Sequence, residues 1–206
     1  DETPSEVSRM SRIAAVVGSK AGWFVLRETP LPGPWSWFVA DTFDEAMQRL
    51  ENYEVVAVDA PLSLAELPVQ PDDADEPGIR DRYRRPPEKI REVHDYMRAH
   101  PGSGHFLYEV HPRLSFLELK GGMADQQPAD SKPRFRDQLS FLCDIFPSEA
   151  LYQALTAFRH AEASRNDILD AFAMLWSAKR IATSRAERLP SMPVYDARGF
   201  DMAIWY

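Results

Sequence analysis

The alternation of apolar and polar positions along the first half of the chain predicts five β-strands. Three runs rich in β-branched and aromatic residues come first, and Gly and Pro residues separate them, which indicates an antiparallel meander. Two later runs are short and nearly continuously apolar, as in strands that are buried on both faces of a sheet. The five runs cover residues 13–17, 23–27, 35–39, 54–59 and 105–110.

Apolar residues that recur every three to four positions predict helices between and after these strands. Asp41 or Thr42 can cap the first helix, and Ser164 is the expected N-cap of the last one. The last helix is apolar on most of its faces, so we expect it to lie deep against the sheet. The helical segments are residues 43–50, 87–99, 135–146, 150–158 and 164–176.

Two segments lack any periodicity. Residues 66–86 are rich in Pro, Asp, Glu and Arg and predict a long surface loop, and residues 1–9 predict a flexible tail. The remainder, residues 10–206, has the length of one domain with a substantial core.

The order of these elements predicts a mixed α/β fold, in which an antiparallel meander is extended by parallel crossovers and flanked by helices. A mixed five-stranded sheet in this order is that of the ribonuclease-H-like fold. In that fold the active site lies where the ends of the first and fourth strands meet the final helix. The carboxylates near those positions are therefore the first candidates for function.

Composition and charge narrow the function classes. With 44% hydrophobic and 27% charged residues the chain should fold, and its net charge of −8 disfavours unspecific nucleic-acid binding unless basic residues gather on one face. Cys143 is the only cysteine, which excludes an internal disulfide and fits a reducing compartment; we expect it to be buried. No apolar run approaches the roughly 20 residues that cross a bilayer, so we predict a cytoplasmic protein without membrane association.

Asp59 and Glu109 lie at or near the ends of the two buried strands. A carboxylate at the position of Asp59 either coordinates a ligand or caps the following turn, and sites in open α/β sheets gather at strand ends. A glutamate inside a strand needs a partner, and for Glu109 that partner is a metal, an arginine or a backbone amide.

Asp167 and Asp170 are three residues apart on the last helix and so project from neighbouring positions. Asp167 lies in the first turn, where it is either a metal ligand or an electrostatic cap. Asp170 interrupts an apolar stretch, where an uncompensated carboxylate would cost several kcal/mol, which favours a functional role.

If these four carboxylates converge, hard divalent cations such as Mg²⁺ or Mn²⁺ are their natural counterions, with Asp59, Glu109 and Asp170 as the metal ligands. Such a site suits phosphodiester hydrolysis, in which one ion activates water and another stabilises the leaving oxygen. His111 could transfer a proton, although a histidine before proline at a strand end is more often structural. Basic residues could bind phosphate or simply be solvated; they are Lys20, Arg82, Arg85 and Lys132.

Four motifs in the chain resemble those of an uncharacterised prokaryotic family of predicted ribonuclease-H-like nucleases. The likeness spans nearly everything after Met10. The family pattern is Val-Asp-Gly-x-Lys-x-Gly-Trp in the first strand, Asp-x-Pro, Tyr-Glu-x-His-Pro-x-x-Ser-Phe and Asp-Asp-x-x-Asp-Ala. The corresponding residues here begin at Val16, Asp59, Tyr108 and Asn166.

The resemblance implies a metal-dependent nuclease, with two departures from the family pattern, one of them at the position that bridges the catalytic metals. Where the family pattern has a first-strand aspartate, this chain has Val17, and Asn166 replaces a second acidic residue. We therefore expect either a divalent-metal-dependent phosphodiester hydrolase impaired by the loss of one ligand, or an inactive relative that binds a nucleic acid, a nucleotide or a protein. A small phosphorylated or acidic metabolite is a third candidate ligand.

Overall fold

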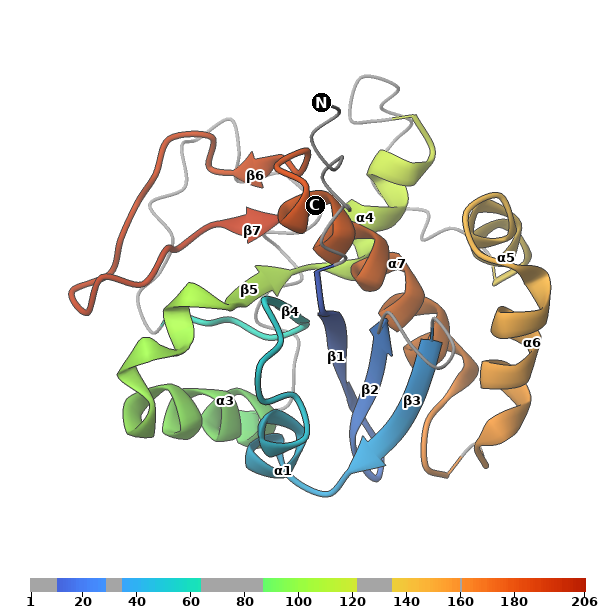
Figure 1. The fold of residues 1–206 in the computed structure, drawn as a ribbon, viewed down its shortest axis with the longest axis horizontal. Coiled ribbons are helices and arrows are strands. Elements are labelled where there is room, and N and C mark those ends of the chain that lie inside the picture. Colours follow the sequence, from blue (N-terminus) through green and yellow to red (C-terminus); the bar gives the residue numbers. More distant parts are fainter. Residues whose placement is uncertain (1–10, 29–34, 64–86, 122–134, 160) are drawn as a thin grey trace, which may run out of the picture.

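A computed structural model describes residues 11–28, 35–63, 87–121, 135–159 and 161–206 of the chain. In these residues a single mixed sheet is flanked by helices on both faces (Figure 1). The predicted tail 1–9 and the predicted loop 66–86 lie outside the described residues. None of the described helices is both long and apolar enough to cross a membrane.

Seven strands form the sheet, in the order β3-β2-β1-β4-β5-β7-β6. The first three pair antiparallel, whereas β4 and β5 run parallel to β1, as the sequence predicts. The C-terminal β7 adds parallel to β5, and β6 pairs with it antiparallel. The strands are β1 Ile13–Ser19, β2 Gly22–Glu28, β3 Trp35–Ala40, β4 Val55–Val58, β5 Leu107–Val110, β6 Arg188–Leu189 and β7 Ile204–Trp205.

A two-residue turn joins β1 to β2, because Ser19 pairs with Gly22. Gly22 has a φ of +150°, and a Cβ atom there would lie 2.0 Å from the carbonyl oxygen of Ala40 on β3. Only glycine fits this close approach of two backbones. Gly22 thus allows the tight hairpin between β1 and β2.

Two cores lie on opposite faces of the sheet. Helices α1 (Phe43–Gln48) and α3 (Pro87–Ala99) cover one face, which we call the α3 face, and α7 (Arg165–Ala182) crosses the other, the α7 face (Figure 1). Alternate residues of β1 divide between the cores, because successive side chains of a strand point to opposite faces. Val16 belongs to the α3 face and Val17 to the α7 face.

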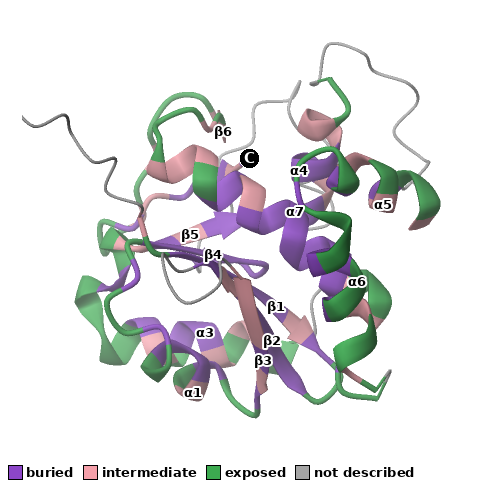
Figure 2. Ribbon diagram, turned by 45° about the vertical axis from the view of Figure 1, so that its right-hand side comes forward, coloured by how far each residue is buried: buried purple, intermediate pink, exposed green. Residues whose placement is uncertain are grey.

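Helix α7 is buried along most of its length, as predicted from its sequence (Figure 2). Ser164 is its N-cap and Thr42 is the N-cap of α1, which confirms both expected caps. Three further helices lie on the same side of the sheet as α7 (Figure 2), and a short 3-10 helix precedes β5. These elements are α4 Pro112–Leu119, α5 Phe135–Cys143, α6 Ser148–Ala157 and η2 Pro101–His105.

The structure differs from the sequence-based expectations in its element list and at Cys143. The elements α4, η2, β6 and β7 have no counterpart among the predicted ones, so the sheet has seven strands instead of the five predicted. Cys143 is exposed rather than buried, because α5 turns Gln138 and Leu142 toward the core and its last residue away from it.

Candidate functional site

The candidate site lies at the carboxyl ends of the parallel strands β1, β4 and β5. Asp59 directly follows β4, and its backbone N–H donates a 3.0 Å hydrogen bond to the carbonyl oxygen of Val16. Since Val16 pairs with Val58, the next residues along the two strands, Val17 and Asp59, are neighbours. Val58 and Ala60 both belong to the core of the α3 face, so alternation assigns the buried side chain of Asp59 to the α7 face.

Asp170 lies on α7 at the level of Val17. At one end of the helix the N–H of Ala21 lies 3.4 Å from the carbonyl oxygen of Glu162, and at the other Lys179 forms a 3.1 Å ion pair with Glu28, the strand partner of Ile13. These two contacts orient α7 antiparallel to β1. Asp170 precedes Lys179 by about 14 Å along the helix axis. Val17 follows Ile13 by about 13 Å along the strand.

Asp59, beside Val17 in the sheet, and Asp170, level with Val17 on α7, therefore lie at the same end of the α7 face. Both carboxylates are buried, at 3% and 8% exposure, and Val17 is fully buried. This is the part of the expected convergence that the geometry supports.

The amino-terminal end of α4 points toward this place. Ser115 of α4 and Ser177 of α7 form a 2.8 Å hydroxyl hydrogen bond, and Glu118 of α4 pairs with Arg180 of α7 at 3.1 Å. The two helices thus run side by side in the same direction. Asp170 precedes Ser177 by two helical turns on the same face, which puts it about 6 Å beyond the start of α4. The positive end of the α4 dipole stabilises negative charge there.

Glu109 has a different role from the one expected of a metal ligand. It pairs with Val58 in register and so points to the α3 face, opposite to Asp59. Its carboxylate is buried and accepts a 3.0 Å hydrogen bond from the backbone N–H of Leu62. A backbone amide was one of the three partners that the sequence left open. Through this bond Glu109 holds the segment that follows Asp59.

Asp167 acts as a helix cap. Its carboxylate accepts a 2.8 Å hydrogen bond from the backbone N–H of Ser164, and the Ser164 hydroxyl accepts one of 3.1 Å from the backbone N–H of Asp167. This reciprocal arrangement is a capping box, which satisfies two backbone donors at the start of α7. The structure thus supports the capping interpretation of Asp167.

His111 also has a structural role. It is the N-cap of α4, and its Nδ1 accepts a 3.3 Å hydrogen bond from the backbone N–H of Arg113. On β5, three residues earlier, burial raises the pKa of the Tyr108 phenol above its ordinary value, and the charge of Asp201 raises it further.

The carboxylates consequently do not form a cluster of three. Within the described ranges no group of three or more His, Cys, Asp or Glu side chains could hold a metal ion. The physical reasons are visible residue by residue: Val17 replaces one carboxylate, Asp167 caps a helix and Glu109 points to the other face. Binding of Mg²⁺ or Mn²⁺ stays a prediction that concerns Asp59 and Asp170.

Of the basic residues expected to meet phosphate, only Lys20 falls in the described part of the chain. It is exposed in the β1–β2 turn, next to Ala21, whose N–H reaches the segment before α7. Arg82, Arg85 and Lys132 lie outside the described residues.

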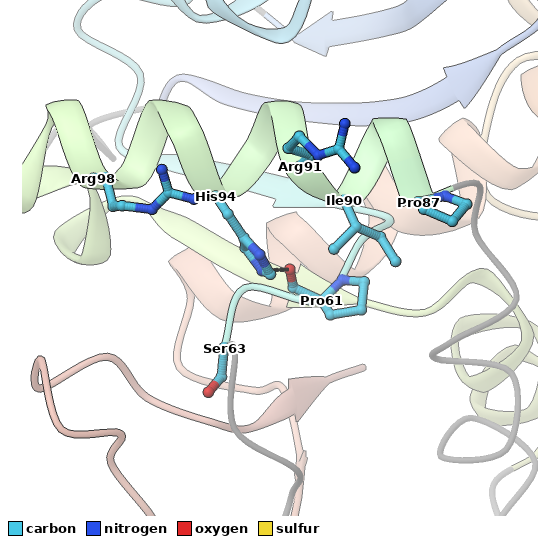
Figure 3. A pocket seen from close by; sticks show the side chains of 7 residues that line it. All are labelled: Pro61, Ser63, Pro87, Ile90, Arg91, His94 and Arg98. Carbon is cyan, nitrogen blue, oxygen red and sulfur yellow. Dashed lines mark hydrogen bonds between the residues drawn. The ribbon is translucent and has the colours of Figure 1, made fainter.

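A cavity that the sequence had not indicated lies on the other side of the Asp59 segment. It has a volume of about 370 Å³ and is formed by α3 and the residues after Asp59 (Figure 3). Its lining residues are Pro61, Ser63, Pro87, Ile90, Arg91, His94 and Arg98. The signal for it was present in the spacing of Arg91, His94 and Arg98, which lie along one side of a predicted helix.

The fold and the site together define a mixed α/β protein with a pair of buried aspartates at the carboxyl edge of its parallel strands. Residues 87–194, just over half of the chain, match a family described as "Protein of unknown function (DUF429)". The chain belongs to this family. The matched region contains Glu109, Asp167 and Asp170, whereas Val17 and Asp59 precede it. No curated protein matches the chain.

Proposed function

We propose that this protein is a ribonuclease-H-like protein that binds a nucleotide or nucleic acid at the carboxyl edge of its sheet and has lost efficient metal-dependent hydrolysis. The observation that carries the proposal is the position of Val17. A fully buried valine stands beside Asp59 and level with Asp170, where a two-metal site would need a further carboxylate.

The arrangement of the sheet supports the ribonuclease-H-like part of the proposal. An antiparallel β1–β2–β3 meander continues through β4 and β5, which both run parallel to β1, and the final long helix packs across β1. The analogy also draws on the order of the carboxylates, since Asp59 follows β4, Glu109 lies in β5 and Asp170 lies on that helix. Fold-level likeness is an argument by analogy, so the activity rests on the site.

Two-metal hydrolysis needs ions about 3.5–4 Å apart that are held by several oxygen ligands. Here the Glu109 carboxylate holds the backbone N–H of Leu62, and the Asp167 carboxylate holds that of Ser164. Diverting either group would leave a backbone donor without its partner, which costs about 1–3 kcal/mol when the donor is buried. These side chains are therefore poorly suited to complete a second ion site.

A second candidate function is phosphodiester hydrolysis with one Mg²⁺ or Mn²⁺ ion. It is favoured by the burial of Asp59 and Asp170 on the same face, near the start of α4. Two carboxylates and several waters form a common Mg²⁺ environment. Such a site would bind the ion weakly and act slowly.

Binding and hydrolysis measured side by side on the same preparation separate the two candidates. We expect calorimetry to detect binding of AMP or of a short single-stranded oligonucleotide. We expect bis(p-nitrophenyl) phosphate and labelled RNA and DNA to stay intact when Mg²⁺ or Mn²⁺ is present.

Metal-dependent cleavage that disappears in both Asp59→Asn and Asp170→Asn would establish the second candidate instead. The matched control for both variants is Asp137→Asn, which changes an acidic residue in the first turn of α5. Absence of binding to AMP and to oligonucleotides would refute the proposed function.

A further inference from the structure

The cavity on the α3 face has the chemical character of an anion site. Two arginines line it, Arg91 and Arg98, together with the imidazole of His94, and among the described residues that line it none is acidic. The two arginines are separated by two turns of α3, with His94 between them (Figure 3). In a protein whose net charge is −8, this side of α3 concentrates positive charge around a hollow.

Buried polar groups form the inner wall of the cavity. Ser63 is 4% exposed and His94 is 5% exposed. His94 Nε2 lies 3.0 Å from the carbonyl oxygen of Pro61, and because a carbonyl oxygen only accepts, the ring nitrogen donates (Figure 3). This bond ties the Pro61–Ser63 segment to α3, while Glu109 holds Leu62 from the other side. The wall is thus fixed in place before any ligand arrives.

The dipole of helix α3 adds to the positive electrostatic potential at the cavity. Pro87 is its first residue and lines the cavity, so the cavity lies against the first turn of a 13-residue helix. The amino-terminal end of such a helix carries partial positive charge, which favours anions, and the guanidinium of Arg91 adds a full charge one turn later.

The remaining lining residues are apolar and give the cavity a surface for a ring. Pro61, Pro87 and Ile90 lie between the charged groups, and Ile90 points from α3 toward Pro61 (Figure 3). A volume of about 370 Å³ lies near the lower end of the range for small-molecule sites. The hollow therefore suits a ligand that joins anionic groups to a flat apolar ring.

We propose that this cavity binds a mononucleotide, with Arg91 and Arg98 on its phosphates and its ring against Pro61 and Ile90. The inference rests on the proposed function in taking the ligand to be a nucleotide. The new element is the place of the phosphates, which bind on the α3 face. The Asp59–Ser63 segment separates them from Asp59 and Asp170 on the α7 face. Arginine suits this role because its planar fork binds phosphate oxygens through two hydrogen bonds.

One neighbouring acid competes with the ligand. Asp95 forms a 2.7 Å ion pair with Arg98, in which both side chains are more than half exposed. An exposed pair of this kind is weak, so a phosphate can draw Arg98 away from it. Removal of the Asp95 charge should therefore strengthen anion binding, an effect opposite in sign to that of removing either arginine.

The test is calorimetric titration of AMP, ADP and pyrophosphate into the full chain and into single variants. We expect Arg91→Ala and Arg98→Ala each to weaken ADP binding at least about tenfold. Asp95→Asn should strengthen it by about two- to fivefold. Arg136→Ala, on α5, is the matched control and should change nothing. All four side chains are exposed, so the variants should fold like the parent, which circular dichroism verifies.

The outcomes separate this inference from the proposed function. Loss of ADP binding in both arginine variants, with the Asp95→Asn gain, supports both. Unchanged ADP binding in the arginine variants overturns the α3 site and leaves nucleotide binding standing. Binding of oligonucleotides without any binding of AMP, ADP or pyrophosphate also overturns the α3 site alone. A parent protein that binds none of these probes overturns both.

Discussion

Replacement of Val17 by aspartate tests the geometry of the carboxylate site most directly. The substitution puts a third carboxylate beside Asp59 and level with Asp170, at a position that is fully buried in the α7 face. Without a metal ion this change should destabilise the protein. Loss of the buried valine side chain costs about 1.5–3 kcal/mol. The added like charge in a buried site raises the total to about 3–5 kcal/mol.

A divalent ion should reverse much of this loss, because three carboxylates around one position form a hard oxygen site. If Mn²⁺ binds the variant with a dissociation constant of about 10 μM, 1 mM Mn²⁺ at about 100 times that constant stabilises it by about 2.7 kcal/mol. For a chain of this length that corresponds to an increase in Tm of about 5–10 °C. The parent protein, with two carboxylates, should shift by about 2 °C or less.

Differential scanning fluorimetry with and without Mn²⁺, followed by calorimetry, measures these shifts. Val17→Asn is the matched control, since it has the same shape as aspartate and no charge, and Mn²⁺ should stabilise it no more than the parent. Addition of Asp170→Asn to Val17→Asp should abolish the gain. If Mn²⁺ raises the Tm of Val17→Asp and Val17→Asn equally, a carboxylate at position 17 does not share an ion with the two aspartates and the reasoning is wrong.

Three further predictions concern contacts other than those of Asp59 and Asp170. Ser115→Ala should destabilise the protein by about 1–3 kcal/mol, because it leaves the buried Ser177 hydroxyl without its partner. The double variant with Ser177→Ala should recover part of this loss in urea denaturation. Asp167→Ala should cost about 1 kcal/mol through loss of the α7 cap, with Mn²⁺ affinity unchanged in calorimetry; a large loss of affinity would restore Asp167 as a ligand. Burial alone would raise the pKa of Asp196, yet hydrogen bonds from Phe200 and Arg198 outweigh it and lower the pKa. Its stabilisation is therefore present above the unfolded pKa and is lost as the pH falls through the lower folded value, which amide exchange of residues 196–200 between pH 5 and about 2 would reveal.

The sequence was sufficient for features that depend on local pattern. The period-two and period-3.6 repeats placed five strands and the main helices, and short-range capping chemistry identified Thr42 and Ser164. The two C-terminal strands were missed because each has two residues and exists only through pairing with β5 or with each other. Helix α4 was missed because its eight residues are too short for a helical repeat to stand out.

The candidate site was predictable only in part, because its geometry also depends on pairing between segments that are far apart in the sequence. A carboxylate after a buried strand placed Asp59 at the sheet edge, and the apolar surroundings of Asp170 indicated its burial. Which face each side chain occupies depends on the register between neighbouring strands, and Glu109 points away from Asp59 because it pairs with Val58, one residue earlier on β4. The basic side of α3 escaped notice because Glu88, Glu92 and Asp95 alternate with its cations along the sequence.

The short run from Asp59 to Ser63 separates the two faces of the sheet edge. One end carries an aspartate of the α7 face, and the other end forms the wall of the α3 cavity, with Glu109 and His94 fixing it from both sides. A ligand that binds on one face and moves residues 59–63 would also change the geometry of the site on the other face. Thermodynamic linkage then requires that a cation and a nucleotide change each other's dissociation constant by the same factor. The segment from Asp59 to Ser63 would thus couple the binding of the cation to the binding of the nucleotide.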